Sequence, residues 1–348
     1  MRALLTSTTL YECMSLESLI SETRLRFPHY QDGAFDVHPI EKGGSDRKYY
    51  RIRFGADASL ILVKYRIDRG ENARFVAIAN FLSGIGINAP LIYFHDEEQG
   101  SIWLQDLGDE DLWHHRTENW EARGELYRRT LDEALILHKT DAAVRLPPNG
   151  PPEFDANLFR WEQEYGFQNC FQLCFRIDEA RIRETASRPE FTDLAEQLAA
   201  YPRVLIHRDF QSQNILICDE QAYLIDFQGM RPGLGAYDLA SLLYDPYVTL
   251  SKAEREELID YYLEGYDHRG SRDEFVDLFL RCALQRLLQA LGAYGVIGVR
   301  RQKPEFLRHI GPAIENLREV ASLLPGFSFF EDFLTELPDK PKPLPNAA

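Results

Sequence analysis

The hydrophobic pattern of this 348-residue chain changes from strand-like to helix-like about a third of the way along. Short runs of strand-forming residues occupy 34–40, 48–54, 59–65, 90–95 and 101–107, and a single helical pattern covers 71–84. The run KYYRIRF alternates apolar and basic side chains, which is the period of a half-buried antiparallel strand. After Trp113 long helical periods follow, beginning at 119–139. Because the chain exceeds the usual size of one core, it is expected to form an α+β fold of two lobes, an antiparallel sheet with one helix followed by a mainly helical lobe.

The domain boundaries are predicted from the same change of pattern. We expect an N-lobe over 1–108, a C-lobe over 109–337 and a proline-rich tail over 338–348 with a polyproline-like conformation. A surface loop is expected at 145–153, since four prolines and a glycine deny this stretch regular backbone hydrogen bonds.

Composition excludes several classes of protein. Apolar residues make up 45% and charged residues 27%, which is ordinary for a globular protein, and the net charge of −16 argues against nucleic acid or an anionic membrane as a partner. The five cysteines are scattered, and Cys170 and Cys174, four apart, are expected to be free thiols. The N-terminus has no signal-peptide core, and no apolar run of about 18 residues is present. A cytoplasmic protein is therefore expected.

The segment HRDFQSQN, residues 207–214, precedes two short strands at 214–218 and 222–227. An antiparallel hairpin of these strands would bring Asn214 beside Asp226, so that an amide oxygen and a carboxylate face one point. Such oxygen ligands suit Mg²⁺, which keeps waters and phosphate oxygens as its other ligands. Asp209 would lie near that ion and could accept a proton from a hydroxyl, which is the arrangement used in phosphoryl transfer.

The spacing His-x-Asp-x4-Asn, with Asp226 in LIDFQ, resembles the catalytic loop of the aminoglycoside phosphotransferase and choline kinase superfamily. This resemblance implies a bilobal protein-kinase-like fold, an ATP and Mg²⁺ requirement, Asp209 as the catalytic base, and Asn214 and Asp226 as metal ligands. It also implies that His207 orients the loop and that Asp238 is a buried aspartate bonded to the loop; the alternative for Asp238 is an N-cap of a helix from 239.

The resemblance extends to the first lobe. It implies nucleotide contacts from Gly44, Ser45, Lys64, Glu71, Gln105, Asp106 and Leu107.

The contacts of the turn, of Lys64 and of Glu71 each have an alternative. The turn at Gly44 and Ser45 would cradle phosphates or be a plain hairpin turn. Lys64 would contact the α- and β-phosphates or be a solvated lysine at a strand end. Glu71 would pair with Lys64 or favour the helix N-terminus through its charge alone. The hinge at 105–107 would hold adenine through its backbone.

The acceptor is expected to be a small molecule, because only eleven residues separate Asp226 from Asp238 and no Ala-Pro-Glu signature follows. The helical C-lobe is expected to form the acceptor pocket. The motifs LQDLGDEDLW, IHRDFQSQNIL and QRLLQALG resemble bacterial N-acetylmuramate and N-acetylglucosamine anomeric kinases of cell-wall recycling. This resemblance implies phosphorylation of an anomeric sugar hydroxyl. The turn at 43–46 departs from the Gly-Asp-Ala-Ser type common in that branch, which leaves the acceptor sugar open.

Two other functions stay open at this point. One is an aminoglycoside- or choline-type kinase, whose cationic acceptors would suit an acidic chain. The other is a nucleotide-binding pseudokinase, which the intact Asp209, Asn214 and Asp226 argue against. Gln211, Gln285 and Arg286 are candidates for acceptor contact or for simple packing.

Overall fold

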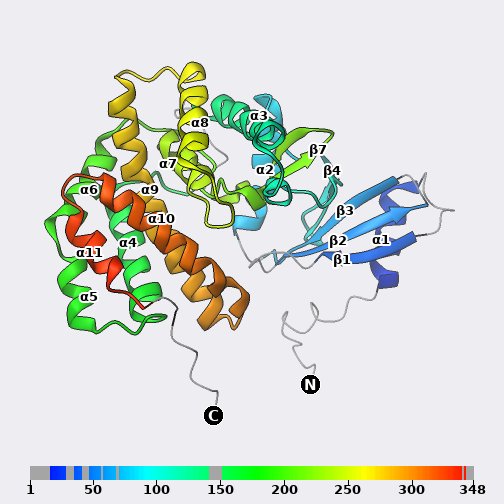
Figure 1. Ribbon diagram of the computed structural model, residues 1–348. Coiled ribbons are helices and arrows are strands. Elements are labelled where there is room, and N and C mark those ends of the chain that lie inside the picture. The colour runs from blue at the N-terminus through cyan, green and yellow to red at the C-terminus, as the bar shows by residue number, and fades with distance from the viewer. Residues whose placement is uncertain are drawn as a thin grey trace, which may run out of the picture. The chain divides into compact units, whose positions relative to one another are not determined.

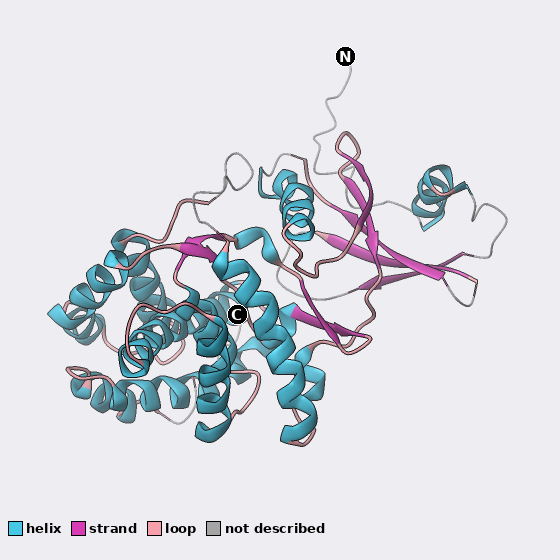
Figure 2. Ribbon diagram, turned by 90° about the horizontal axis from the view of Figure 1, so that it is seen from above, coloured by secondary structure: helices cyan, strands magenta, loops and turns pink. Residues whose placement is uncertain are grey.

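The computed structural model describes residues 16–28, 35–40, 47–55, 58–67, 70–140, 151–338 and 341, without the side chains of 70, 71 and 73. The chain divides into two compact units (Figure 1). The N-terminal unit comprises Met1–Asn80 and Pro90–Leu107, and the C-terminal unit comprises Phe81–Ala89 and Gly108–Ala348. The predicted α+β class is confirmed, with an antiparallel sheet in the first unit and helices dominating the second (Figure 2).

The N-terminal unit is built on a five-stranded antiparallel sheet of order β1-β2-β3-β5-β4. Its strands are β1 (Phe35–Ile40), β2 (Lys48–Phe54), β3 (Ala58–Lys64), β4 (Ile92–Asp96) and β5 (Ser101–Gln105), close to the predicted runs. Lys64 ends β3 and is paired in register with Lys48 of β2 and Ser101 of β5. Helix α2 (Gly70–Gly84) follows β3, as predicted.

A second helix, α1 (Leu16–Arg26), corrects the prediction that this lobe carries a single helix. Leu19 of α1 is fully buried in a core with Leu60, Leu62 and Trp103 of the sheet. Only Leu19 and Thr23 of α1 are buried, and Leu25 is 74% exposed. The helix therefore lacks the apolar stripe by which a helix is recognised in a sequence.

The C-terminal unit is mainly helical. Its long helices are α3 (Trp120–Lys139), α4 (Ala156–Gly166), α5 (Glu179–Ala186), α6 (Pro189–Ala200), α7 (Gly235–Leu243), α8 (Lys252–Gly265), α9 (Arg272–Gly295), α10 (Ile310–Leu323) and α11 (Ser328–Thr335). Its short strands are β6 (Val204–Ile206), β7 (Ile215–Cys218), β8 (Gln221–Leu224) and β9 (Arg231–Gly233).

Helix α9 forms the centre of this unit and packs against α4, α7 and α10. The segment Arg272–Arg300 is long and apolar enough to cross a membrane by composition, but 72% of its most apolar window is buried inside the unit. Its apolar residues therefore serve as core. Cys170 and Cys174 are buried free thiols close to the end of α9, as expected from the sequence.

Two short antiparallel pairs, β6–β9 and β7–β8, frame the segment HRDFQSQN. The β7–β8 hairpin turns at Asp219 and Glu220, which have φ values of 49° and 57°. Two consecutive residues with positive φ match the right-handed twist of a tight hairpin. The predicted hairpin is therefore confirmed, with each strand ending within three residues of its expected bounds.

Candidate active site

Asp238 of α7 fixes the start of the loop between β6 and β7. Its buried carboxylate accepts hydrogen bonds from the backbone N–H groups of His207, at 2.6 Å, and Arg208, at 2.7 Å. Arg208 has a φ of 77°, and such a strained backbone persists only where its surroundings hold it. Helix α7 begins at Gly235, so the N-cap alternative for Asp238 is wrong and the predicted bonding to the loop is confirmed.

His207 ties the same loop to the end of β8. Its side chain is fully buried, and Nε2 lies 2.9 Å from the carbonyl oxygen of Ile225, to which it donates. The interpretation of His207 as an orienting residue is confirmed by this geometry.

Asp245 fixes the other end of the loop and was not identified in the sequence. Its buried Oδ2 accepts from the backbone N–H of Ser212 at 2.8 Å and from the Ser212 hydroxyl at 2.6 Å. Asp245 lies two residues beyond the end of α7, so no helical spacing in the sequence linked it to Asp238. The loop is therefore held at one end by α7 and at the other by a residue just after this helix.

Asn214 and Asp226 lie at the open end of the β7–β8 hairpin. The N–H of Ile225 donates to the carbonyl oxygen of Asn214 at 3.0 Å. This bond places Asp226, the next residue after Ile225, close to Asn214. Asn214 Nδ2 donates to the Asp209 carbonyl oxygen at 2.8 Å, which leaves its Oδ1 available to a metal ion. Asp226 is exposed and has a left-handed backbone with φ of 59°.

This donor set fits Mg²⁺. One amide oxygen and one carboxylate are typical of Mg²⁺ sites, where water and phosphate complete the coordination. Among the described residues there is no group of three or more His, Cys, Asp or Glu that could hold a metal, so a closed all-protein cage is not found in that part of the chain.

Asp209 lies between these ligands and the helices of the unit. Its carboxylate is 32% exposed, and Oδ1 is 3.6 Å from Nη2 of Arg286 on α9. Burial alone would raise the pKa of Asp209, but the positive charges of Arg208 and Arg286 outweigh it and hold the pKa below its ordinary value. The carboxylate is therefore ionised at neutral pH, as a proton acceptor must be.

Glu162 of α4 is the second carboxylate near this loop and was also not identified in the sequence. It is fully buried, with Oε1 3.5 Å from Nη2 of Arg208 and Oε2 3.1 Å from the hydroxyl of Tyr237. Burial raises the pKa of Glu162, although Arg208 opposes this effect. Gln285 of α9 donates to Glu162 Oε2 at 3.3 Å and is fully buried, so it packs within the network.

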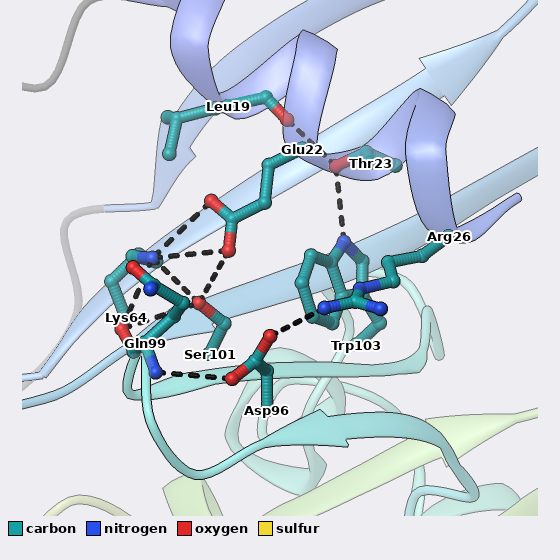
Figure 3. Close-up of polar contacts among 9 residues, drawn as sticks. All are labelled: Leu19, Glu22, Thr23, Arg26, Lys64, Asp96, Gln99, Ser101 and Trp103. Atoms are coloured by element: carbon teal, nitrogen blue, oxygen red, sulfur yellow. Dashed lines mark hydrogen bonds and ion pairs between the residues drawn. The ribbon is translucent and has the colours of Figure 1, made fainter.

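Lys64 lies in the N-terminal unit, beside α1 (Figure 3). Its buried Nζ is 3.3 Å from both carboxylate oxygens of Glu22, 2.5 Å from the Ser101 hydroxyl and 3.4 Å from the Gln99 carbonyl oxygen. By strand alternation Lys64 shares its face of β3 with Leu60 and Leu62, which pack against α1. The solvated-lysine alternative is therefore wrong.

The other predicted nucleotide residues have varied positions. Gly44 and Ser45, and the side chain of Glu71, lie outside the described residues. Asp106 forms a bidentate ion pair with Arg51, at 2.7 and 3.0 Å, and Gln105 Oε1 accepts from the N–H of Leu91.

Comparison with known proteins identifies the family. Residues 36–275, more than half of the chain, match the phosphotransferase enzyme family. The chain is 26% identical to an N-acetylmuramate/N-acetylglucosamine kinase of Pseudomonas aeruginosa, covering 87% of this chain and 89% of that protein, and 28% identical to one of Pseudomonas putida, covering 84% and 86%. Its fold is similar to that of an ethanolamine kinase of Plasmodium vivax, with a TM-score of 0.61 at 17% identity, covering 92% and 93%. The chain therefore belongs to the phosphotransferase enzyme family and is a kinase of small molecules.

Proposed function

We propose that this kinase transfers the γ-phosphoryl group of ATP to a hydroxyl of an amino sugar, N-acetylmuramate or N-acetylglucosamine, at the anomeric position. The observation that carries the proposal is the braced loop, in which Asp209 is joined through its carbonyl oxygen to Asn214. The relatives named for these two sugars align with 84–87% of the chain and support the choice of acceptor. A cytoplasmic role in the recycling of cell-wall amino sugars is part of the proposal.

In this proposal Asp209 binds the acceptor hydroxyl and takes its proton as the new O–P bond forms. The lowered pKa of Asp209 keeps its carboxylate ionised for that task. An anomeric hydroxyl is more acidic than an ordinary alcohol, which lowers the demand on the base.

Asn214 Oδ1 and the Asp226 carboxylate would hold Mg²⁺, which would supply positive charge against the charge of the phosphates. Nucleotide contacts from Gly44, Ser45, Glu71 and residues 105–107 stay part of the proposal. A phosphate contact from Lys64 would require it to exchange one of its present partners, since its three donors already meet Glu22, Ser101 and Gln99.

The test is ADP formation from Mg-ATP with a panel of N-acetylmuramate, N-acetylglucosamine, other hexoses, choline and an aminoglycoside. Turnover confined to the amino sugars, with the phosphate on C1 by ³¹P NMR, is the expected result. Turnover of choline or the aminoglycoside alone would contradict an amino-sugar acceptor and show that the acceptor is cationic. Tight Mg-ATP binding without turnover of any compound would contradict the amino-sugar proposal and favour a nucleotide-binding protein.

A further inference from the structure

Three arginines lie in the neighbourhood of Asp209, and we call Arg208, Arg231 and Arg286 the arginine cluster. Arg286 lies 3.6 Å from the Asp209 carboxylate, and Arg208 lies 3.5 Å from Glu162. Arg231 donates to the carbonyl oxygen of Gly229, and Gly229 lies against the side chains of Asp209 and Arg208. Arg208 and Arg286 each have a carboxylate within 4 Å, and Asp245 also acts on Arg286, whereas no carboxylate of the described residues lies within 4 Å of Arg231.

Arg231 of β9 is the member of the cluster with the fewest partners. The residue is only 8% exposed, its Nε donates to the Gly229 carbonyl oxygen at 3.0 Å, and its guanidinium lies 5.5 Å from the centre of the Phe154 ring. Within the described part of the chain, neither of its outer nitrogens, Nη1 and Nη2, has a hydrogen-bond acceptor. The buried Nε of Arg208 likewise has no acceptor among these residues.

A guanidinium on a side chain as buried as that of Arg231 is normally paired, because it loses most of its hydration without compensation. A planar guanidinium matches a carboxylate or phosphate through two parallel hydrogen bonds. Burial, together with the charge of Arg208, lowers the pKa of Arg231 to about 10, so the group remains charged at neutral pH and would be stabilised by an anion. The unpaired donors therefore indicate an anionic ligand.

The elements that hold the cluster indicate which ligand this is. Besides Asp209 and Gln211 of the loop, which contact Arg286, the partners of Arg208 and Arg286 lie on α4, α7 and α9, in Glu162, Ser241 and Gln289. The proposed metal ligands instead flank the β7–β8 hairpin. The cluster thus extends from Asp209 toward the helices, where the sequence predicts the acceptor pocket.

We propose that Arg231, with Arg208, forms a carboxylate-binding subsite for the acceptor, so that the enzyme prefers an acidic amino sugar to a neutral one. This inference rests on the proposed function and deepens it. N-acetylmuramate carries a carboxylate and N-acetylglucosamine does not, so the two sugars test the subsite directly.

The experiment compares N-acetylmuramate with its carboxamide, which has nearly the same shape without the charge. We expect wild-type kcat/KM to favour the acid by about 10- to 100-fold, the size of a charge-assisted pair of hydrogen bonds. Arg231→Gln should reduce this ratio to about 1. Arg231→Lys keeps the charge but loses the planar pair of donors, and it should give an intermediate ratio. Arg123→Gln is the control, since Arg123 also lies over an aromatic ring, Trp120, but is already paired with a carboxylate, Glu254, and it should keep the wild-type ratio.

Two results would overturn the subsite. One is a wild-type ratio near 1. The other is an equal loss for acid and carboxamide in Arg231→Gln, which would place Arg231 at the transferred phosphate or in support of the loop. Dissociation constants of both compounds, measured by calorimetry with ADP in place of ATP, separate this inference from the proposed function. A preference in binding without turnover supports the subsite while the proposed reaction fails, and binding of neither compound overturns both.

Discussion

Lys64 illustrates how the environment of a single residue limits its role. Its ammonium group has three donors, and Glu22, Ser101 and the Gln99 carbonyl oxygen meet them within the N-terminal unit (Figure 3). Two further contacts join α1 to the same sheet, from Trp103 Nε1 to the Thr23 hydroxyl at 3.0 Å and from Arg26 to Asp96 at 2.6 Å. The Lys64–Glu22 pair is therefore part of the attachment of α1.

Removing either partner of this pair should destabilise the N-terminal unit. Lys64→Met and Glu22→Gln should each lower the free energy of unfolding by about 3 kcal/mol, because each leaves a largely buried group without its partner. Chemical denaturation measures this effect, and wild-type stability in both variants would contradict the structural role.

The KM for ATP in the same two variants tests the predicted phosphate contact. A KM that rises in Lys64→Met but not in Glu22→Gln would support this contact. Equal KM values in the two variants would contradict it.

At the scale of elements, α7 and the residues just after it hold the loop of residues 207–214. Asp238 binds the start of the loop at His207 and Arg208, and Asp245 binds its end at Ser212. His138 of α3 lies 3.2 Å from Asp238 and connects this brace to Tyr262 of α8. The position of Asp209 therefore depends on buried residues of three different helices and of the chain after α7.

Asp238→Ala should lower the free energy of unfolding by about 3 kcal/mol, because two buried N–H groups lose their acceptor. It should also lower kcat by more than about 10-fold, since displacement of a catalytic group is costly. Thermal melting and steady-state kinetics measure the two effects. Asp260→Asn, at an exposed residue of α8 paired with Arg272, is the control. A variant Asp238→Ala with wild-type melting and turnover would show that the brace is dispensable.

Elements with a strong local pattern could be predicted from the sequence, and elements without one could not. Strands β1 to β5, helix α2 and the β7–β8 hairpin have strong local periods or turn residues, so each was predicted with ends within three residues of the structure. Helix α1 exposes Leu16 and Leu25 and has no apolar stripe to recognise. The alternation of Leu60, Leu62 and Lys64 placed Lys64 on the core face of β3, a signal that the resemblance to kinases obscured.

Contacts distant in sequence were beyond prediction. Glu162 meets Arg208 across 46 residues of chain, and Arg286 meets Asp209 across 77, with no local pattern to bring them together. His207, Asp209, Asn214 and Asp238 were identified because they fall within one short motif and its following helix.

At the scale of the whole molecule, the two units carry different parts of the account. The braced loop, the proposed metal ligands and the arginine cluster all lie in the C-terminal unit, whereas the predicted nucleotide contacts lie in the N-terminal unit or outside the described residues. The family match spans residues 36–275 and so includes parts of both. Net charge, which excluded nucleic acid as a partner in the sequence analysis, says nothing about the acceptor, because the acceptor meets only the charges of its own pocket.

The central claim is that Asp209 takes the proton of the acceptor, and Asp209→Asn tests it most directly. The variant keeps the shape of the side chain and removes the base, which contributes about 10²- to 10⁴-fold to such reactions. We predict that kcat with N-acetylmuramate falls by at least about 100-fold, while the dissociation constant for Mg-ATP stays within about threefold of wild type and Asp260→Asn remains fully active. Turnover of Asp209→Asn near the wild-type rate would contradict the account.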